Sequence, residues 1–245
     1  MDILSPGVEL NAVHDDDSQS LLVVLLFVLT FVTGLVDAVS YLKLGHVFVA
    51  NMTGNVAFLG FAAAGMADLS VPASLAAIAA FLIGATAGGR LSVHIGKDRV
   101  RFFAVALLIE LVLVAASWFA SIDIADAQVL RYVLIGSLAL AMGLQNAAAR
   151  FLAVPDLNTT VLTLTLTGIA ADSSVAGGGN VRAGRRLMAT LAMLFGAAVG
   201  ALALIHVGVP TVLGLAFALL AFNVLATARH VRARRSAVLA AETRP

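Results

Sequence analysis

The chain has 245 residues, of which 61% are hydrophobic and 12% are charged, and its formal net charge is +1. A soluble globular protein carries roughly 45–50% apolar and about 25% charged residues, so this composition excludes a soluble domain and indicates an integral membrane protein. The small net charge gives no indication of a nucleic-acid partner. Because the chain has no cysteine, disulfides, thiolate nucleophiles and cysteine metal sites are excluded.

Six long apolar runs follow a polar N-terminal tail of residues 1–19, and each run is long enough to cross a bilayer as a helix. The runs cover residues 20–43, 73–95, 101–121, 128–150, 187–207 and 209–228. Two further apolar segments, 47–66 and 157–172, contain Thr, Asn and Gly, and each is either a short span or a re-entrant segment. The predicted fold is therefore all-α, a polytopic transmembrane helix bundle of about six spans plus two short or re-entrant polar segments.

Three sequence landmarks recur in the same order at an offset of roughly 110 residues. They are GLVDAVSYL (34–42) with GLQNAAARF (143–151), Asn51-Met52-Thr53 with Asn158-Thr159-Thr160, and GATAG (84–88) with GAAVG (196–200). Such duplication is a signature of secondary transporters. We expect two membrane repeats, residues 20–126 and 127–230, followed by a basic C-terminal tail of residues 231–245.

The GATAG and GAAVG patterns carry small residues at the spacing that lets membrane helices approach closely. They predict tight packing of the third segment of each half. One arrangement that satisfies this prediction packs these two helices against each other. We assign no chemistry to these patterns.

The placement of Lys and Arg predicts the topology. The basic residues form three clusters, at Lys97, Arg99 and Arg101, at Arg182, Arg185 and Arg186, and at Arg229, Arg232, Arg234 and Arg235. If neither polar segment crosses the membrane, all three clusters lie on one side, which the positive-inside rule makes cytoplasmic. If both cross, giving eight spans, the last cluster lies opposite the others. We favour six spans, three in each half, which makes the repeats inverted and both termini cytoplasmic.

The two polar segments are the predicted substrate site. In the six-span arrangement they enter the membrane from opposite sides, and irregular backbone at that depth is tolerated only where it is buried in protein or lines a wet cavity. The predicted substrate-binding residues are Asn51, Thr53, Gly54, Asn55, Gln145, Asn146, Thr159, Thr160 and Thr163. The alternative is that these Asn and Thr side chains only join helices by hydrogen bonds.

Two carboxylates inside the apolar runs are predicted to handle a coupling proton or ion, because an intramembrane carboxylate is expensive. Asp37 has Arg150 and Lys43 as candidate partners, or it lies in water at the end of its span. Glu110 lies in the middle of its run, so it is neutral, paired or turned toward a polar interior, and His94 is a candidate partner. The alternative for Glu110 is a neutral acid bonded to a neighbouring helix.

Motifs of enzymes are absent from the sequence. There is no HExxH, no GxSxG and no histidine cluster at metal-ligand spacing, so we predict no enzymatic activity, no cofactor and no metal. The segment GNVRAGRR (179–186) has the glycine spacing of a phosphate-binding loop. However, Arg185 stands where Lys is required and no Ser or Thr follows it, so we interpret the segment as a cytoplasmic basic loop.

The segments GLVDAVSYLKLGHVFVANMTGNVAFLG and GLQNAAARFLAVPDLNTTVLT resemble the YoaK family of bacterial membrane proteins, a domain of unknown function, over residues 20–230. The resemblance implies a multi-pass protein of the bacterial inner (plasma) membrane and supplies no substrate. The matching positions are Asp37 and the predicted substrate-binding residues. One departure is Leu164, which follows Thr163 where family members often have Gly, and this weakens the prediction of a helix break there.

We therefore predict a secondary transporter or permease for a small solute that binds between segments 47–66 and 157–172. Asp37 or Glu110 would handle the coupling proton or ion. Two alternatives use the same residues, namely a channel-like pore and a membrane scaffold or partner-binding protein without transport activity. The predicted partners are the lipid bilayer and an unidentified small molecule or ion, and the glycine-rich helix faces leave open a homo-oligomer.

Overall fold

A computed structural model of the chain describes residues 6–66, 69–123, 127–155 and 162–242, and these residues form helices and their connections. Six helices in this part of the chain are long and apolar enough to cross a membrane. They are α1 (Pro6–Lys43, apolar from Gln19), α3 (Val71–Ile95), α4 (Arg99–Asp123), α5 (Ala127–Leu152), α7 (Ala183–His206) and α8 (Val209–Glu242). The shorter elements are α2 (Met52–Ala63), α6 (Leu162–Ala171) and the 3-10 turn η1 (Ser174–Ala176). This confirms the predicted all-α bundle of six spans plus two short segments.

Local signals explain where these helices begin and end. The Ser70 side chain accepts a hydrogen bond from the Ala73 amide at 3.4 Å, and Pro72 occupies the first turn of α3, a position where proline is tolerated. The chain leaves α1 through Gly45, whose φ of +92° lies in the left-handed region that favours glycine. Gly208 has a φ of +99° and makes the turn between α7 and α8.

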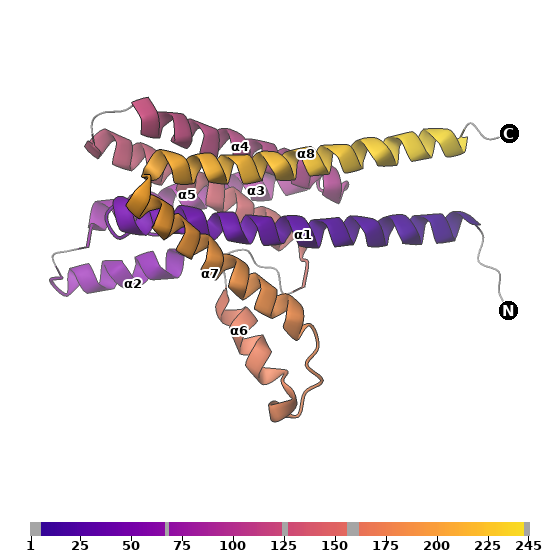
Figure 1. Ribbon diagram of the computed structural model, residues 1–245, viewed down its shortest axis with the longest axis horizontal. Coiled ribbons are helices and arrows are strands. Elements are labelled where there is room, and N and C mark those ends of the chain that lie inside the picture. The colour runs from indigo at the N-terminus through magenta and orange to yellow at the C-terminus, as the bar shows by residue number, and fades with distance from the viewer. Residues whose placement is uncertain (1–5, 67–68, 124–126, 156–161, 243–245) are drawn as a thin grey trace.

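Contacts between helix ends show that neighbouring spans run in alternate directions. These contacts are the hydrogen bond from Arg131 Nε to the Leu44 carbonyl at 2.8 Å, the hydrogen bond from Arg99 to the Leu152 carbonyl, and the Trp118 and Phe217 rings at 5.3 Å. The beginning of α1 and the end of α8 lie at the same end of the bundle (Figure 1). Alternating spans bring the α3–α4 connection and the start of α7 to that end too. The face that is cytoplasmic stays a prediction.

The helices pack in a reciprocal pattern. α1 packs against α7 and α8, and α5 packs against α3 and α4. We compare the two halves by exchanging α1 with α5, α2 with α6, α3 with α7 and α4 with α8. After this exchange, every packed pair of these helices is again a packed pair. A duplicated unit would produce this pattern. The inverted orientation of the repeats and their boundaries stay predictions.

Glycines allow the two tightest helix pairs to meet backbone to backbone. A Cβ atom on Gly84 of α3 would lie 2.0 Å from the Leu140 carbonyl oxygen of α5. A Cβ atom on Gly196 of α7 would lie 2.1 Å from the Phe31 carbonyl oxygen of α1. The GATAG and GAAVG patterns therefore mediate close packing, as predicted, but each packs against the first helix of the opposite half. The alternative that α3 and α7 pack against each other is wrong.

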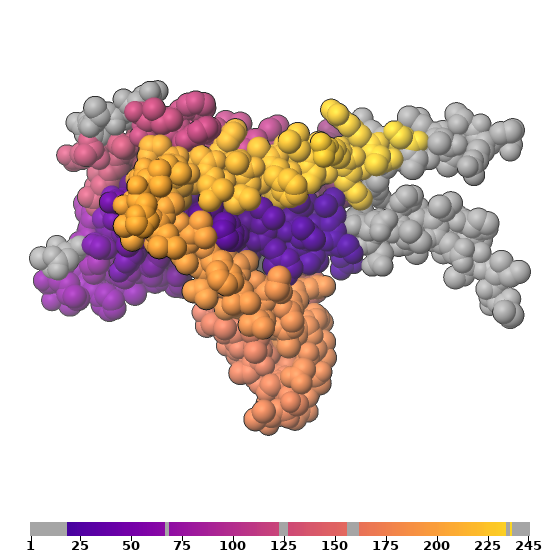
Figure 2. Space-filling view, viewed as in Figure 1, coloured from indigo at the N-terminus to yellow at the C-terminus, as the bar shows by residue number. Residues whose placement is uncertain are grey.

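The short helices lie on the outside of this arrangement. α2 packs against α3, whereas α6 packs against α7 and, together with the start of α7, projects from the bundle (Figures 1 and 2). Both helices expose large apolar side chains, including Val56 and Phe61 on α2 and Leu164 and Leu166 on α6. In a membrane protein, such faces are suited to contact with lipid.

Candidate functional site

The Asp37 carboxylate holds the connection between α1 and α2. Its side chain is buried, and Oδ1 accepts hydrogen bonds from the backbone amides of Val49 at 3.3 Å and Ala50 at 3.1 Å. The predicted pairing with Arg150 or Lys43 is wrong, because the partners of this oxygen are backbone N–H groups. A buried carboxylate satisfied in this way fixes the local path of the chain.

Asn55, on α2, also holds the connection between α1 and α2. Its side chain is fully buried, Oδ1 accepts from the Phe48 amide at 2.9 Å, and Nδ2 donates to the Phe48 carbonyl at 2.6 Å. Gly54 lies under the Phe48 ring, where a Cβ atom would be 2.7 Å from the nearest ring carbon. Thr53 Oγ1 donates to Asn51 Oδ1 at 2.8 Å. The first polar segment therefore uses its polar groups largely within itself.

We expect Asn55→Ala to lower the free energy of unfolding by about 2 kcal/mol, and the melting temperature by roughly 4–8 °C. The substitution leaves the partly buried Phe48 N–H and C=O groups without their partners. Thr53→Ala removes a hydrogen bond of an exposed side chain two residues away, so its effect should stay within about 0.5 kcal/mol. Thermal unfolding of the purified variants measures both effects, and equal losses in the two variants would contradict this role of Asn55.

The second polar segment is only partly described. Thr159 and Thr160 lie outside the described residues. Thr163 is exposed on α6, where its carbonyl accepts a hydrogen bond from Thr167 Oγ1 at 2.8 Å. Asn146 donates to the Met142 carbonyl of its own helix at 2.9 Å. The described parts of the two polar segments do not form a packed pair, since α2 packs on α3 and α6 on α7.

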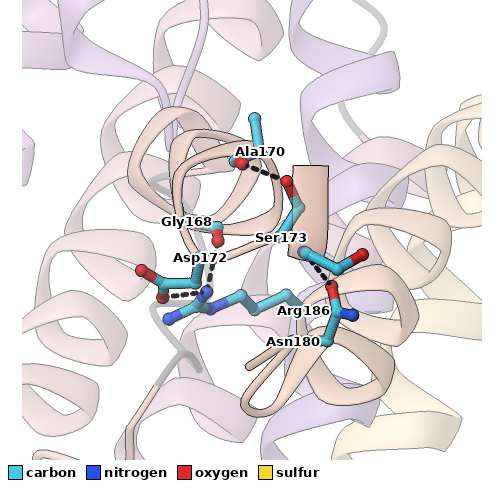
Figure 3. Close-up of polar contacts among 7 residues, drawn as sticks. Gly168, Ala170, Asp172, Ser173, Asn180 and Arg186 are labelled. Atoms are coloured by element: carbon cyan, nitrogen blue, oxygen red, sulfur yellow. Dashed lines mark hydrogen bonds and ion pairs between the residues drawn. The ribbon is translucent and has the colours of Figure 1, made fainter. Parts of the chain in front are cut away.

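A group of polar contacts connects the end of α6 to the start of α7 (Figure 3). Arg186 Nη1 donates to Asp172 Oδ2 at 2.6 Å and to the Gly168 carbonyl. The Asn180 side chain accepts from the Ser174 amide at 3.1 Å, which ties the following loop to η1. The segment 179–186, with the glycine spacing of a phosphate-binding loop, thus holds the start of α7 to the end of α6 through the Arg186 guanidinium.

A second set of polar side chains lies buried in the middle of the spans. Gln145 Nε2 of α5 donates to Thr33 Oγ1 of α1 at 2.9 Å, and Asn223 Nδ2 of α8 donates to the Leu25 carbonyl of α1 at 3.2 Å. Thr33 and Asn223 are absent from the predicted site. Their signal in the sequence is a polar residue in the middle of an apolar run, as in LLAFNVLA (219–226).

Glu110 of α4 is buried in the same central region, with 2% of its surface exposed. Its Oε1 atom has no hydrogen-bond partner among the described residues. The predicted partner His94 is exposed, and its Nδ1 lies 2.7 Å from the Arg90 carbonyl of its own helix. The pairing of Glu110 with His94 is therefore wrong, and the carboxyl group is left facing the interior of the bundle.

Comparisons with known proteins find a family of unknown function and a relative described as a transmembrane protein. A family described as "Protein of unknown function (DUF1275)" matches residues 25–226. The chain is 36% identical over 152 residues to the UPF0700 transmembrane protein YoaK of Bacillus subtilis (strain 168). That match covers 61% of this chain and 66% of the relative, just under two thirds of the relative's length. No solved structure matches the chain.

Proposed function

We propose that this chain, which belongs to the DUF1275 family of multi-pass membrane proteins of unknown function, is a secondary transporter or permease for a small solute. The observation that carries the proposal is the reciprocal packing of its two halves. Transporters built from repeats bind their substrate at the interface between units that move against each other. Here the units are two helix pairs, α1 with α7 and α3 with α5.

Each helix pair is suited to move as a rigid body. Backbone contacts at glycines join α1 to α7 and α3 to α5. Because the backbones meet directly, each pair lacks the side-chain layer over which two helices could slide past each other. Between the pairs, the Thr33–Gln145 hydrogen bond is a polar contact that a small rotation can break and remake. Motion at this boundary would expose the interior alternately at the two ends of the bundle.

In this proposal, the short helices α2 and α6 lie at the two entrances of the pathway that the solute follows through the bundle. α2 follows the end of α1 and α6 follows the end of α5, and these ends lie at opposite ends of the bundle. Thr53 is an exposed polar position of α2 and Thr163 is one of α6, and we place these two groups along the solute pathway. In this proposal Asp37 and Asn55 hold the first entrance in shape, since the backbone of residues 48–50 occupies their polar atoms.

Cysteine labelling tests the pathway, because the chain has no native cysteine. We expect Thr53→Cys and Thr163→Cys, made one at a time, to react with a membrane-impermeant thiol reagent, each from the side where its short helix enters. Both positions are exposed, so the substitutions should leave the fold intact. Val56→Cys and Leu164→Cys are matched controls on the same helices, and their apolar, exposed positions should face lipid and stay unlabelled.

The labelling pattern also separates the proposal from its alternatives. If neither Thr53→Cys nor Thr163→Cys is labelled from either side, water does not reach the pathway and a scaffold is favoured. If one of them is labelled from both sides at once, a channel-like pore is favoured instead. A transporter predicts access from one side at a time, with a change of reactivity when the transported solute is added.

A further inference from the structure

Three buried side-chain oxygens in the middle of the bundle have no hydrogen-bond partner among the described residues. They are Glu110 Oε1, Gln145 Oε1 and Asn223 Oδ1, on α4, α5 and α8. The exposed fractions of these side chains are 2%, 1% and 0%. Native structures satisfy most buried polar groups, so an oxygen left in this way needs an explanation such as a bound ion.

The register of the helices brings the three oxygens to a similar depth. α4 runs antiparallel to α5, with Ser117 Oγ 2.6 Å from Ser137 Oγ, and antiparallel to α8, with Trp118 beside Phe217. Glu110 lies seven residues before Ser117, and Gln145 lies eight residues after Ser137. Asn223 follows Phe217 by six residues, so at a rise of about 1.5 Å per residue all three lie within roughly one helical turn of each other in depth.

Hydrogen bonds to α1 fix which way each amide points. The Thr33 hydroxyl donates its hydrogen to the Leu29 carbonyl at 2.9 Å, so toward Gln145 it can only accept, and the atom that donates to it must be Nε2. Asn223 likewise faces the Leu25 carbonyl, to which only its nitrogen can donate. Both amide oxygens are therefore left for another ligand.

The chemistry of the three groups favours a monovalent cation. A carboxylate and two amide oxygens are all acceptors, so a proton on Glu110 would supply one donor and leave an oxygen unsatisfied. A cation can contact all three, and amide and carboxylate oxygens are ligands that hard cations prefer. A single positive charge neutralises Glu110, whereas a divalent ion would leave a net charge buried in the membrane.

We propose that Glu110, Gln145 and Asn223 form a binding site for a monovalent cation between α4, α5 and α8. This inference rests on the proposed transport function, for which it names the coupling ion and its ligands. It assigns the coupling role to Glu110, since Asp37 holds the connection between α1 and α2.

Thermal unfolding of the purified full chain tests the site. Choline chloride is replaced stepwise by sodium chloride or by potassium chloride at constant ionic strength. The reporter is Trp118, the single tryptophan of the chain, which lies beside Phe217 in the α4–α8 interface. A ligand that binds only the folded state raises the melting temperature in a saturable way, so we expect this response to at least one of the two ions in the unmodified protein.

Substitutions assign the response to the site. Glu110→Gln should abolish the cation-dependent rise, and the matched control Asp98→Asn, at an exposed carboxylate that caps the start of α4, should keep it. Asn223→Leu removes one ligand oxygen without changing a charge and should raise the half-saturating cation concentration roughly tenfold. Because this second variant keeps Glu110, the proposal stays testable if Glu110→Gln fails to fold.

Several results would overturn the site. These are no response of the unmodified protein to either cation, an unchanged response in Glu110→Gln, and an unchanged half-saturating concentration in Asn223→Leu. A melting temperature that depends on pH through Glu110 but not on either cation would identify a proton site and also reject the proposal. The cysteine labelling above is independent of these results, so the loss of the cation site and the loss of the transport pathway are distinguishable.

Discussion

Gly84→Ala is expected to destabilise the protein by about 3 kcal/mol, or roughly 6–12 °C in melting temperature. The added Cβ would lie 2.0 Å from the Leu140 carbonyl oxygen, and because this neighbour is backbone, α3 and α5 must move apart. Five residues later on the same helix, Gly89 has nothing within 4 Å of an added Cβ. Gly89→Ala should instead stabilise the helix by about 0.5–1 kcal/mol, so the two substitutions differ in sign.

The same experiment in the other half tests whether the packing is reciprocal. Gly196→Ala should cost about as much as Gly84→Ala, because its Cβ would lie 2.1 Å from the Phe31 carbonyl oxygen of α1. Thermal unfolding of the purified variants measures the losses. If Gly84→Ala is as stable as Gly89→Ala, the backbone contact between α3 and α5 is not present in the membrane protein.

Asp37→Ala is expected to lower the free energy of unfolding by about 2–4 kcal/mol, since two buried amides lose the oxygen that accepts from them. Asp37→Asn keeps an oxygen at the same position and should recover most of this loss. Thermal unfolding measures the stability of both variants, and hydrogen exchange at the Val49 and Ala50 amides should be faster in Asp37→Ala. If Asp37→Asn is as damaging as Asp37→Ala, the charge of this carboxyl group has a role beyond accepting these hydrogen bonds.

The spans were predictable because an apolar run of bilayer length has few alternatives to a membrane helix. The short helices were also predictable, since Thr, Asn and Gly interrupt segments 47–66 and 157–172 that are otherwise apolar. α2 and α6 lie within these ranges. The presence of a close helix approach at GATAG was visible in the sequence as well, because small residues at this spacing remove the side chains that keep helices apart.

The contact partners of the small-residue patterns and of the buried polar side chains were not predictable from the sequence. A small-residue pattern does not indicate which helix it meets, and the carbonyl that faces Gly84 belongs to α5, whose position depends on the whole bundle. Asp37 and Asn55 were visible as costly polar groups, but their partners are backbone groups of a loop, which carry no signal in residue type. Asn223 carried the same signal, a polar residue in an apolar run, but its partner is again a backbone carbonyl, on a helix almost two hundred positions away.

Separate expression of the two halves tests whether they pack against each other through α1 with α7 and α3 with α5. The proposed transport motion depends on this packing. Residues 1–126 and 127–245 would be produced as two chains, together or alone, and purified through a tag on one of them. We predict that the halves co-purify, that Gly84→Ala or Gly196→Ala lowers the yield of the complex, and that neither half alone shows cooperative unfolding. A half that unfolds cooperatively by itself, or a complex whose yield neither substitution changes, would contradict the reciprocal packing of α1 with α7 and α5 with α3.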